Sequence, residues 1–147
     1  CTASAKNNSR GVAKTEACKA LGADVVIDYG QDEWSDVLAG QEYDLVFDTI
    51  GKQEDWANAS KVLKKGGDFI SVANFAADAA ANECNVFKNF LLKSDGGDLR
   101  DLVAMVKAGK LTVPVDSVVP FADVPAALAK SLAQANAGKI VVDVARA

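Results

Sequence analysis

The sequence predicts an α/β fold built on a doubly wound parallel sheet. Short apolar runs rich in β-branched and aromatic residues recur along the 147-residue chain, separated by segments of helix length. Such runs indicate strands buried on both faces, and their alternation with helices is typical of a parallel sheet covered on both sides. The central run is Tyr43–Gly51, and the others are Asp24–Asp28, Gly67–Val72 and Gly138–Val144.

The helices expected between these strands follow from apolar spacing and from their end signals. They should begin near Ser9, Asp32, Glu54, Leu99 and Asp123, and Asp32 and Asp123 are expected to cap theirs. Glycine commonly follows the last residue of a helix, and the glycines expected to end these helices are Gly22, Gly40, Gly66 and Gly109. The helix from Glu54 is expected to run to Lys64, with Trp56, Ala59 and Leu63 facing the core.

Three segments carry weaker or different signals. Thr2-Ala3-Ser4 has the composition of a strand end whose beginning is missing, so we expect a fragment of a longer polypeptide. Residues 73–93 have no clean periodicity and are expected to be irregular with some helix. Residues 113–121 contain two prolines, which restricts them to an edge strand or an extended connector.

Composition excludes several classes of function. The net charge is −4 and the basic residues are scattered, which argues against a nucleic-acid partner. No apolar run approaches the roughly 18–20 residues that span a bilayer. Cys1, Cys18 and Cys84 are far apart and are interpreted as reduced thiols of an intracellular protein.

The chain contains no histidine. This removes the commonest metal ligand and the usual general base, so we expect neither a metal site nor catalytic residues among these side chains. The aspartates that flank the strands do not converge in the predicted fold, which also disfavours a carboxylate metal site.

The turn after the first strand end offers donors suited to a phosphate. Ser4, Lys6 and Arg10 supply a hydroxyl and two cations, and no acidic residue occurs before Glu16. In dinucleotide-binding folds a carboxylate in this region binds the adenine ribose, and its replacement by donors favours a 2′-phosphate. The turn therefore predicts NADP rather than NAD, the alternative being an ordinary polar surface turn.

Three further strand ends, at Tyr29, at Thr49–Gly51 and at Val72–Asn74, are candidate ligand positions, because ligands of open α/β sheets bind outside the carboxyl ends of the strands. Tyr29 either contacts the adenosine part of a cofactor or fixes a turn as a half-buried side chain. Ile50 and Gly51 end the central run, where glycine permits close approach of a ligand or simply a tight turn into a helix. No Gly-x-Gly-x-x-Gly occurs in the sequence, and we expect that phosphate-binding turn immediately upstream of Cys1.

Several motifs in order resemble the C-terminal half of the medium-chain dehydrogenase/reductases, and within them the zinc-independent quinone oxidoreductases and alkenal (enone) reductases. The motifs are Thr2-Ala3-Ser4, Leu21-Gly22-Ala23-Asp24, Ile27-Asp28-Tyr29, Asp44 to Gly51, Leu63-Lys64-Lys65-Gly66-Gly67, Gly109-Lys110-Leu111, Val115-Asp116 and Gly138-Lys139-Ile140-Val141. The resemblance covers nearly the whole chain and is weakest from Ala76 to Asp95.

The resemblance implies a Rossmann-type domain that binds NADPH and lacks its first βα unit, with residues 1–147 forming part of that domain and a substrate domain absent. It implies that Ser4 and Lys6 hold the 2′-phosphate and that Tyr29 contacts the adenosine. Ile50 and Gly51 would border the cofactor cleft, and Val72 would lie near the nicotinamide. Many relatives have an arginine shortly before the last strand, where this chain offers Asn136.

The function implied is NADPH-dependent reduction of a quinone or an α,β-unsaturated carbonyl by hydride transfer, with this chain contributing the cofactor-binding part. The alternative is a non-catalytic structural or accessory subunit of a larger assembly, which the missing glycine turn allows. Expected partners are a small-molecule substrate and either a second copy of the chain, a missing domain or a larger complex. The expected compartment is the cytoplasm, the alternative being a plastid or a mitochondrion.

Overall fold

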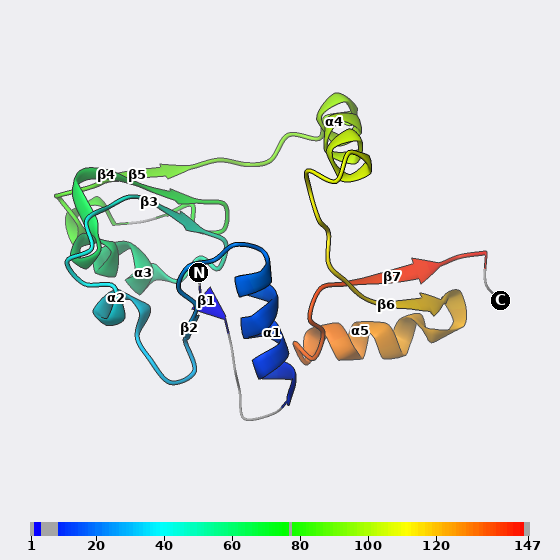
Figure 1. The fold of residues 1–147 in the computed structure, drawn as a ribbon. Coiled ribbons are helices and arrows are strands. Elements are labelled where there is room, and N and C mark those ends of the chain that lie inside the picture. Colours follow the sequence, from blue (N-terminus) through cyan, green and yellow to red (C-terminus); the bar gives the residue numbers. More distant parts are fainter. Residues whose placement is uncertain (1, 4–8, 77, 146–147) are drawn as a thin grey trace. The chain divides into compact units, whose positions relative to one another are not determined.

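The computed structural model describes residues 2–3, 9–76 and 78–145 (Figure 1). The chain divides into two compact units, which we call the outer unit (residues 1–30 and 95–147) and the middle unit (residues 31–94). Every described strand pair is parallel. The mixed α/β class with parallel pairing is therefore confirmed, and the described strands form three separate sheets, of order β1-β2, β3-β4-β5 and β6-β7.

The outer unit contains two of these sheets and three α-helices among its described residues. Its elements are β1 (Thr2–Ala3), α1 (Ser9–Ala20), β2 (Ile27–Asp28), α4 (Gly96–Lys107), β6 (Val115–Pro120), η3 (Phe121–Asp123), α5 (Val124–Leu132) and β7 (Lys139–Asp143). The strand expected over Asp24–Asp28 is thus confined to its last two residues. β6 begins just after Pro114 and ends at Pro120, and it has one partner strand, as its prolines predict.

Helix α1 ends where Gly22 predicts that it should. Gly22 has a φ of +95°, its N–H donates to the carbonyl of Lys19 at 2.9 Å, and Ala23 N–H donates to the carbonyl of Cys18 at 3.1 Å. These two bonds form a Schellman motif, which satisfies carbonyls that have no partner within the helix.

Asp116 on β6 joins three parts of the outer unit. Its carboxylate forms an ion pair with Lys130 of α5, and it accepts hydrogen bonds from the backbone N–H of Ala137 at 2.9 Å and from Ser117 Oγ at 3.0 Å. The Lys130 bond above all, and then the Ala137 N–H, lower the pKa of Asp116 to about 2. One carboxylate therefore ties β6 both to α5 and to the segment that leads into β7.

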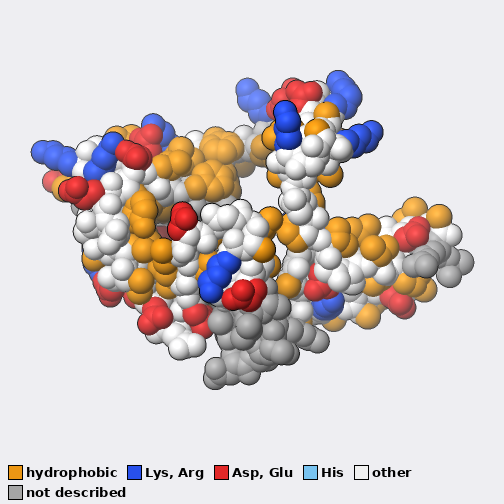
Figure 2. All heavy atoms as spheres, in the orientation of Figure 1, with side chains coloured by type: hydrophobic (Ala, Val, Ile, Leu, Met, Phe, Trp, Pro, Cys, Tyr) orange, Lys and Arg blue, Asp and Glu red, His pale blue; other side chains and the backbone are white. Residues whose placement is uncertain are grey.

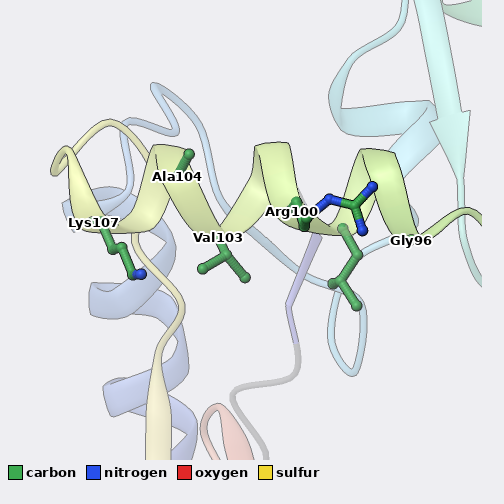
Figure 3. Close-up of a pocket in the computed structure, with 6 residues that line it drawn as sticks. Gly96, Arg100, Val103, Ala104 and Lys107 are labelled. Atoms are coloured by element: carbon green, nitrogen blue, oxygen red, sulfur yellow. The ribbon is translucent and has the colours of Figure 1, made fainter.

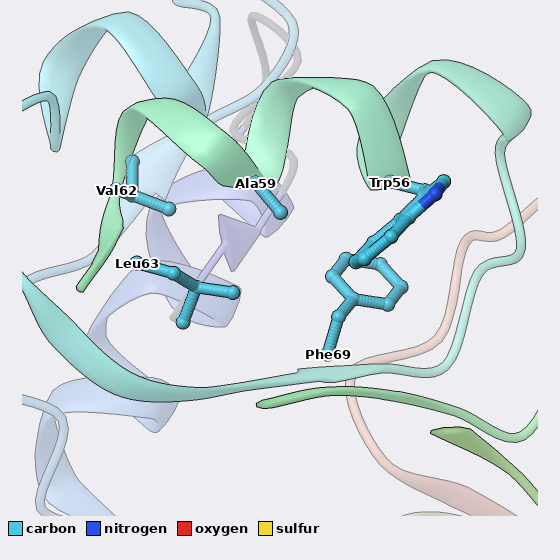
Figure 4. Packing of buried hydrophobic residues seen from close by; sticks show 5 residues of the cluster. All are labelled: Trp56, Ala59, Val62, Leu63 and Phe69. Atoms are coloured by element: carbon cyan, nitrogen blue, oxygen red, sulfur yellow. The ribbon is translucent and has the colours of Figure 1, made fainter. Parts of the chain in front are cut away.

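The middle unit is a three-stranded sheet with helical turns over one face. Its elements are α2 (Trp34–Val37), β3 (Tyr43–Asp48), α3 (Gln53–Asn58), η1 (Ala59–Lys61), β4 (Leu63–Ser71), η2 (Ala79–Ala81) and β5 (Val86–Asn89). The core lies between α3, η1 and the sheet and consists of Trp56, Ala59, Val62, Leu63 and Phe69 (Figure 4). Trp56 packs edge to face on Phe69 and on Phe87 of β5, with ring centroids 5.6 and 5.3 Å apart.

The predicted helix over Glu54–Lys64 is wrong at its end, because α3 and the short helix η1 that follows it stop at Lys61. Trp56, Ala59 and Leu63 are buried as expected, but β4 already begins at Leu63 and pairs there with Tyr43. The register then shifts between Tyr43 and Leu45, and Gly66, with a φ of +76°, lies at this irregularity. The glycine pair therefore marks a bulge inside a strand and not the end of a helix.

Two other expectations need correction. Asp32 does not cap the short helix, because Glu33 occupies the N-cap position of α2 and makes no side-chain capping bond. The segment 73–93 is irregular as predicted, but it also contains β5, which pairs with β4 from Asp68 to Ser71. Hydrogen bonding to an existing strand edge stabilises this short strand, a factor that single-sequence patterns do not contain.

The expectation that the central strand is buried on both faces is also wrong. Val46 packs on the core, whereas Tyr43, Leu45 and Phe47 point to the opposite face of the sheet, because side chains alternate along a strand, and they are exposed. Figure 2 shows hydrophobic side chains, in orange, at the molecular surface, and α4 contributes further examples, since Leu99 is 61% exposed.

Candidate functional site

The carboxyl ends of β3 and β4 lie side by side in the middle unit, because the strands are parallel and Asp48 is in register with Ser71. The loops that leave these two ends therefore start next to each other. Ligands of open α/β sheets bind outside such strand ends. These two loops, residues 49–52 and 72–76, are the candidate site.

Asp48 organises the loop that follows β3. Its carboxylate oxygen Oδ1 accepts hydrogen bonds from the backbone N–H of Ile50 at 2.8 Å and of Gly51 at 3.0 Å. The second oxygen, Oδ2, accepts one from the hydroxyl of Ser71 at 2.7 Å. The residue is only 7% exposed, and these donors satisfy the buried carboxylate.

Ser71 organises the loop that follows β4 in the same way. Its side chain is fully buried, and Oγ accepts hydrogen bonds from the backbone N–H of Ala73 at 3.1 Å and of Asn74 at 2.8 Å. The backbone N–H of Val72 donates to the carbonyl of Asp48 at 3.0 Å. The second loop is therefore bound to the end of both strands.

The two loops touch at Gly51 and Ala73. A Cβ atom at Gly51 would lie 2.9 Å from the carbonyl carbon, the carbonyl oxygen and the Cβ of Ala73, and the φ of Gly51 is +85°. A side chain at this position would collide with backbone and would also occupy an unfavourable conformation. Glycine is thus required here by a close approach as well as by the turn.

Asn74 lies next to this contact and has an unsatisfied donor. Its Oδ1 accepts hydrogen bonds from Gln53 Nε2 at 3.4 Å and from the backbone N–H of Ala76 at 3.1 Å. The amide nitrogen Nδ2 is buried and has no partner among the described residues, and the residue is 3% exposed. A buried donor without a partner is unfavourable, and an acceptor that reached it would relieve that cost.

Charges of both signs lie around Asp55 near this end of the sheet. Burial raises the pKa of Asp55, and its hydrogen bond from Trp34 Nε1, at 2.9 Å, opposes that effect. The ammonium of Lys52 also lowers this pKa, while the neighbouring carboxylates of Asp48 and Glu54 raise it.

The structure brings together three of the residues that the sequence nominates. Ile50, Gly51 and Val72 lie on the two adjoining loops, and Ile50 is 69% exposed although it is apolar. Val72 is half-buried. Their proximity follows from the parallel register of β3 and β4.

The other nominated residues lie elsewhere. Tyr29 follows β2 in the outer unit and is 48% exposed. Asn136, in the same unit, donates through Nδ2 to the carbonyl of Gly138 at 2.7 Å, so its amide supports the turn before β7. Ser4 and Lys6, predicted to hold the 2′-phosphate, lie outside the described residues.

Sequence reasoning missed Asp48 and Ser71, and it nominated the strand end Val72–Asn74 without giving Asn74 a role. Asp48 entered the sequence argument only as an aspartate flanking a strand. A usable signal was present, because an aspartate and a serine lie near the ends of the predicted runs Tyr43–Gly51 and Gly67–Val72. They are the last residues of the observed strands β3 and β4. Such terminal polar residues meet only if the strands are neighbours in register, which the sequence alone does not state.

A pocket lies along one side of α4 (Figure 3). Gly96, Leu99, Arg100, Val103, Ala104 and Lys107 line it. All six residues belong to one helix, so no second element encloses a ligand there, whereas ligand sites are typically concave and bury most of a ligand.

Two further findings concern the described residues. They contain no group of three or more His, Cys, Asp or Glu side chains that could hold a metal ion. Within the same part of the chain, no helix has the length and apolar content needed to cross a membrane.

Comparison with known proteins defines the class. The family model described as zinc-binding dehydrogenase matches residues 21–142, and the chain belongs to this family. The resemblance to the medium-chain dehydrogenase/reductases drawn from the sequence is thereby confirmed.

Two curated relatives have reductase names. The chain is 32% identical over 131 residues to the NADPH-dependent alkenal/one oxidoreductase, chloroplastic, of Arabidopsis thaliana, covering 88% of this chain and 31% of that protein. It is 30% identical over 108 residues to the 2-methylene-furan-3-one reductase of Solanum lycopersicum, covering 74% of this chain and 25% of that protein. The chain thus spans a third or less of the length of these two relatives.

Solved structures share the fold. The quinone oxidoreductase from Coxiella burnetii superposes with a TM-score of 0.76 at 22% identity, covering 97% of this chain and 44% of that one. A mycobacterial protein solved as a complex with NADPH gives a TM-score of 0.71 at 20% identity, covering 96% and 47%. These likenesses confirm the Rossmann-type fold.

Proposed function

We propose that the chain is the cofactor-binding part of an NADPH-dependent reductase of quinones or α,β-unsaturated carbonyls, within a longer polypeptide. The observation that carries the proposal is the pair of adjoining loops after β3 and β4, which hold Ile50, Gly51 and Val72 and touch at Gly51 and Ala73. Family membership and the names of the alkenal/one and furanone reductases support the reaction class.

The described residues fit a bound dinucleotide in two respects. The backbone at Gly51 lacks a side chain where the two loops touch, and the buried Nδ2 of Asn74 offers a donor that no described residue uses. The exposed side chain of Ile50 supplies apolar surface beside them. When bound, NADPH supplies the hydride, and the protein contributes binding and orientation.

The preference for NADPH over NADH rests on Ser4 and Lys6. A hydroxyl and an ammonium suit a 2′-phosphate, which carries a charge near −2, and they suit a bare ribose hydroxyl less well. The name of the Arabidopsis relative, an NADPH-dependent oxidoreductase, agrees with this preference.

The test is to measure the affinity of the full-length protein for NADPH and NADH by nicotinamide fluorescence, with Lys6→Ala alongside. We expect NADPH to bind more tightly, and Lys6→Ala to weaken NADPH binding about tenfold or more while leaving NADH unchanged. Lys65→Ala is the charge-matched control, because Lys65 is exposed and lies in β4 on the far side of the glycine bulge from Ser71.

Turnover then separates the substrate classes. NADPH oxidation should require a quinone or a conjugated carbonyl and should not occur with a saturated ketone. Failure of both nucleotides to bind would overturn the proposal and favour the non-catalytic subunit.

A further inference from the structure

The carboxylate of Asp48 and the hydroxyl of Ser71 hold both loops of the candidate site through one hydrogen bond. Asp48 binds the N–H groups of Ile50 and Gly51, Ser71 binds those of Ala73 and Asn74, and the two side chains are 2.7 Å apart. Four backbone groups on two different loops are therefore positioned by two side chains.

The arrangement requires this pair of residue types. A serine oxygen can accept two hydrogen bonds and donate one. In Ser71 the acceptor positions face two backbone N–H groups, so its proton must go to an acceptor, which Asp48 Oδ2 provides. An asparagine at position 48 that kept the bonds to Ile50 and Gly51 would direct its NH₂ group at an oxygen that is already saturated.

The pair also sets the distance between the loops. Gly51 and Ala73 are already in contact, and Val72 N–H donates to the Asp48 carbonyl at 3.0 Å. A loop released from its side-chain anchor could not move inward, because backbone blocks it. It would move outward, which would separate Ile50 from Val72.

From this geometry we infer that Asp48 and Ser71 are positioning residues of the cofactor site, which fix the separation of the Ile50–Gly51 and Val72–Asn74 segments that contact the dinucleotide. The inference rests on the proposed function. Neither residue needs to contact the cofactor, since both are buried and their polar atoms are used by the loops.

The experiment is a double-mutant cycle in the full-length protein with Asp48→Asn, Ser71→Ala and the double variant. The affinity for NADPH and the thermal midpoint are measured for each protein. We expect each single variant to weaken NADPH binding about tenfold, the loss expected for a hydrogen bond to a charged group. The double variant should lose no more than one single variant, because all three lack the same link.

A matched control separates positioning from loss of stability. Val62→Ala removes volume from a fully buried core residue that precedes the opposite end of β4. It should lower the thermal midpoint as much as Ser71→Ala or more, yet leave the affinity for NADPH within about twofold of the wild type.

Each outcome is decisive. Equal weakening of NADPH binding by Val62→Ala and Ser71→Ala would overturn the positioning role, as would unchanged affinity in Asp48→Asn. Additive losses in the double variant would show that the two residues act separately, which also contradicts the inference. Absence of NADPH binding by the wild type would instead refute the proposed function.

Discussion

Gly51 and Ala73 are in backbone contact across the ends of two parallel strands, close enough that a Cβ on Gly51 would lie 2.9 Å from three atoms of Ala73. Gly51→Ala should therefore be more destabilising than a positive φ alone explains. The matched control is Gly40→Ala, because Gly40 has a φ of +76° and no atom lies within 4 Å of the position that its Cβ would take. Gly40→Ala should cost about 1–2 kcal/mol, the usual cost of a left-handed alanine.

Gly51→Ala should lower the free energy of unfolding by more than Gly40→Ala does, as measured by urea denaturation of the two variants. The excess measures the collision with Ala73. Equal losses in the two variants would show that the loop after β4 yields without cost and that the contact imposes no constraint.

Phe69 is the largest fully buried side chain among the described residues, and it stacks on Phe87 with ring centroids 5.8 Å apart. Phe69→Ala should lower the free energy of unfolding by about 3–5 kcal/mol, because it leaves a cavity between α3 and the sheet. Phe121→Ala is the control, since Phe121 is 64% exposed. Phe121→Ala should alter the free energy of unfolding by no more than about 0.5 kcal/mol, with both variants measured by urea denaturation. A comparable loss in both would mean that this core does not determine stability.

Asp95 and Asp123 occupy the same N-cap position on different helices but bond differently. Asp95 accepts hydrogen bonds from the N–H groups of Gly97 and Asp98 at 2.6 and 3.3 Å, whereas Asp123 makes no side-chain capping bond. Asp95→Ala should therefore cost about 1 kcal/mol and Asp123→Ala close to nothing. Circular dichroism during thermal unfolding of the two variants checks this, and the reverse order would contradict it.

The Asp116–Lys130 ion pair predicts an acid-dependent loss of stability. The pKa of Asp116 is lowered from 3.8 to about 2 in the folded protein, so the folded state binds its proton less readily than the unfolded state. The stabilisation is fully present above the unfolded pKa and is lost as the pH falls through the folded value. Stability should therefore decrease between about pH 4 and pH 2.

Asp116→Asn should remove this part of the pH dependence, as measured by urea unfolding at intervals across that range. Asp123→Asn should keep the wild-type loss, because Asp116 is intact. If the stability of Asp116→Asn fell with pH as steeply as that of the wild type, other carboxylates would account for the whole effect.

The sequence predicted the parts of the fold that local patterns control. Apolar runs located β3 and β7, and Gly22 ended α1 where its left-handed conformation was expected. The strand β5 was not predicted, because its four residues are too short a run to show a period and they form a strand by pairing with β4. The early start of β4 at Leu63 depends in the same way on Tyr43, a partner remote in the sequence.

The residues of the candidate site likewise differ in how far local sequence patterns reveal them. Gly51 was recognisable because glycine at a strand end has a limited set of uses. The bond between Asp48 and Ser71 was not, because it depends on which strands are neighbours and on their register to the residue. Asn74 lies in the segment where periodicity failed, and its unsatisfied amide is visible only in three dimensions.

The parallel pairing has a consequence for how the chain reaches its folded state. Val46 pairs with Phe69 and Val118 with Val141, so none of the described strand pairs can form as a hairpin between adjacent segments. Each pair requires the closure of a crossover before its first hydrogen bond forms, which places such topologies among the slower-folding small proteins. During synthesis β3 is complete well before β4 emerges, and its exposed Leu45 and Phe47 then have no partner strand beside them. Newly synthesised β3 therefore presents apolar side chains and an unpaired strand edge to other chains until β4 pairs with it.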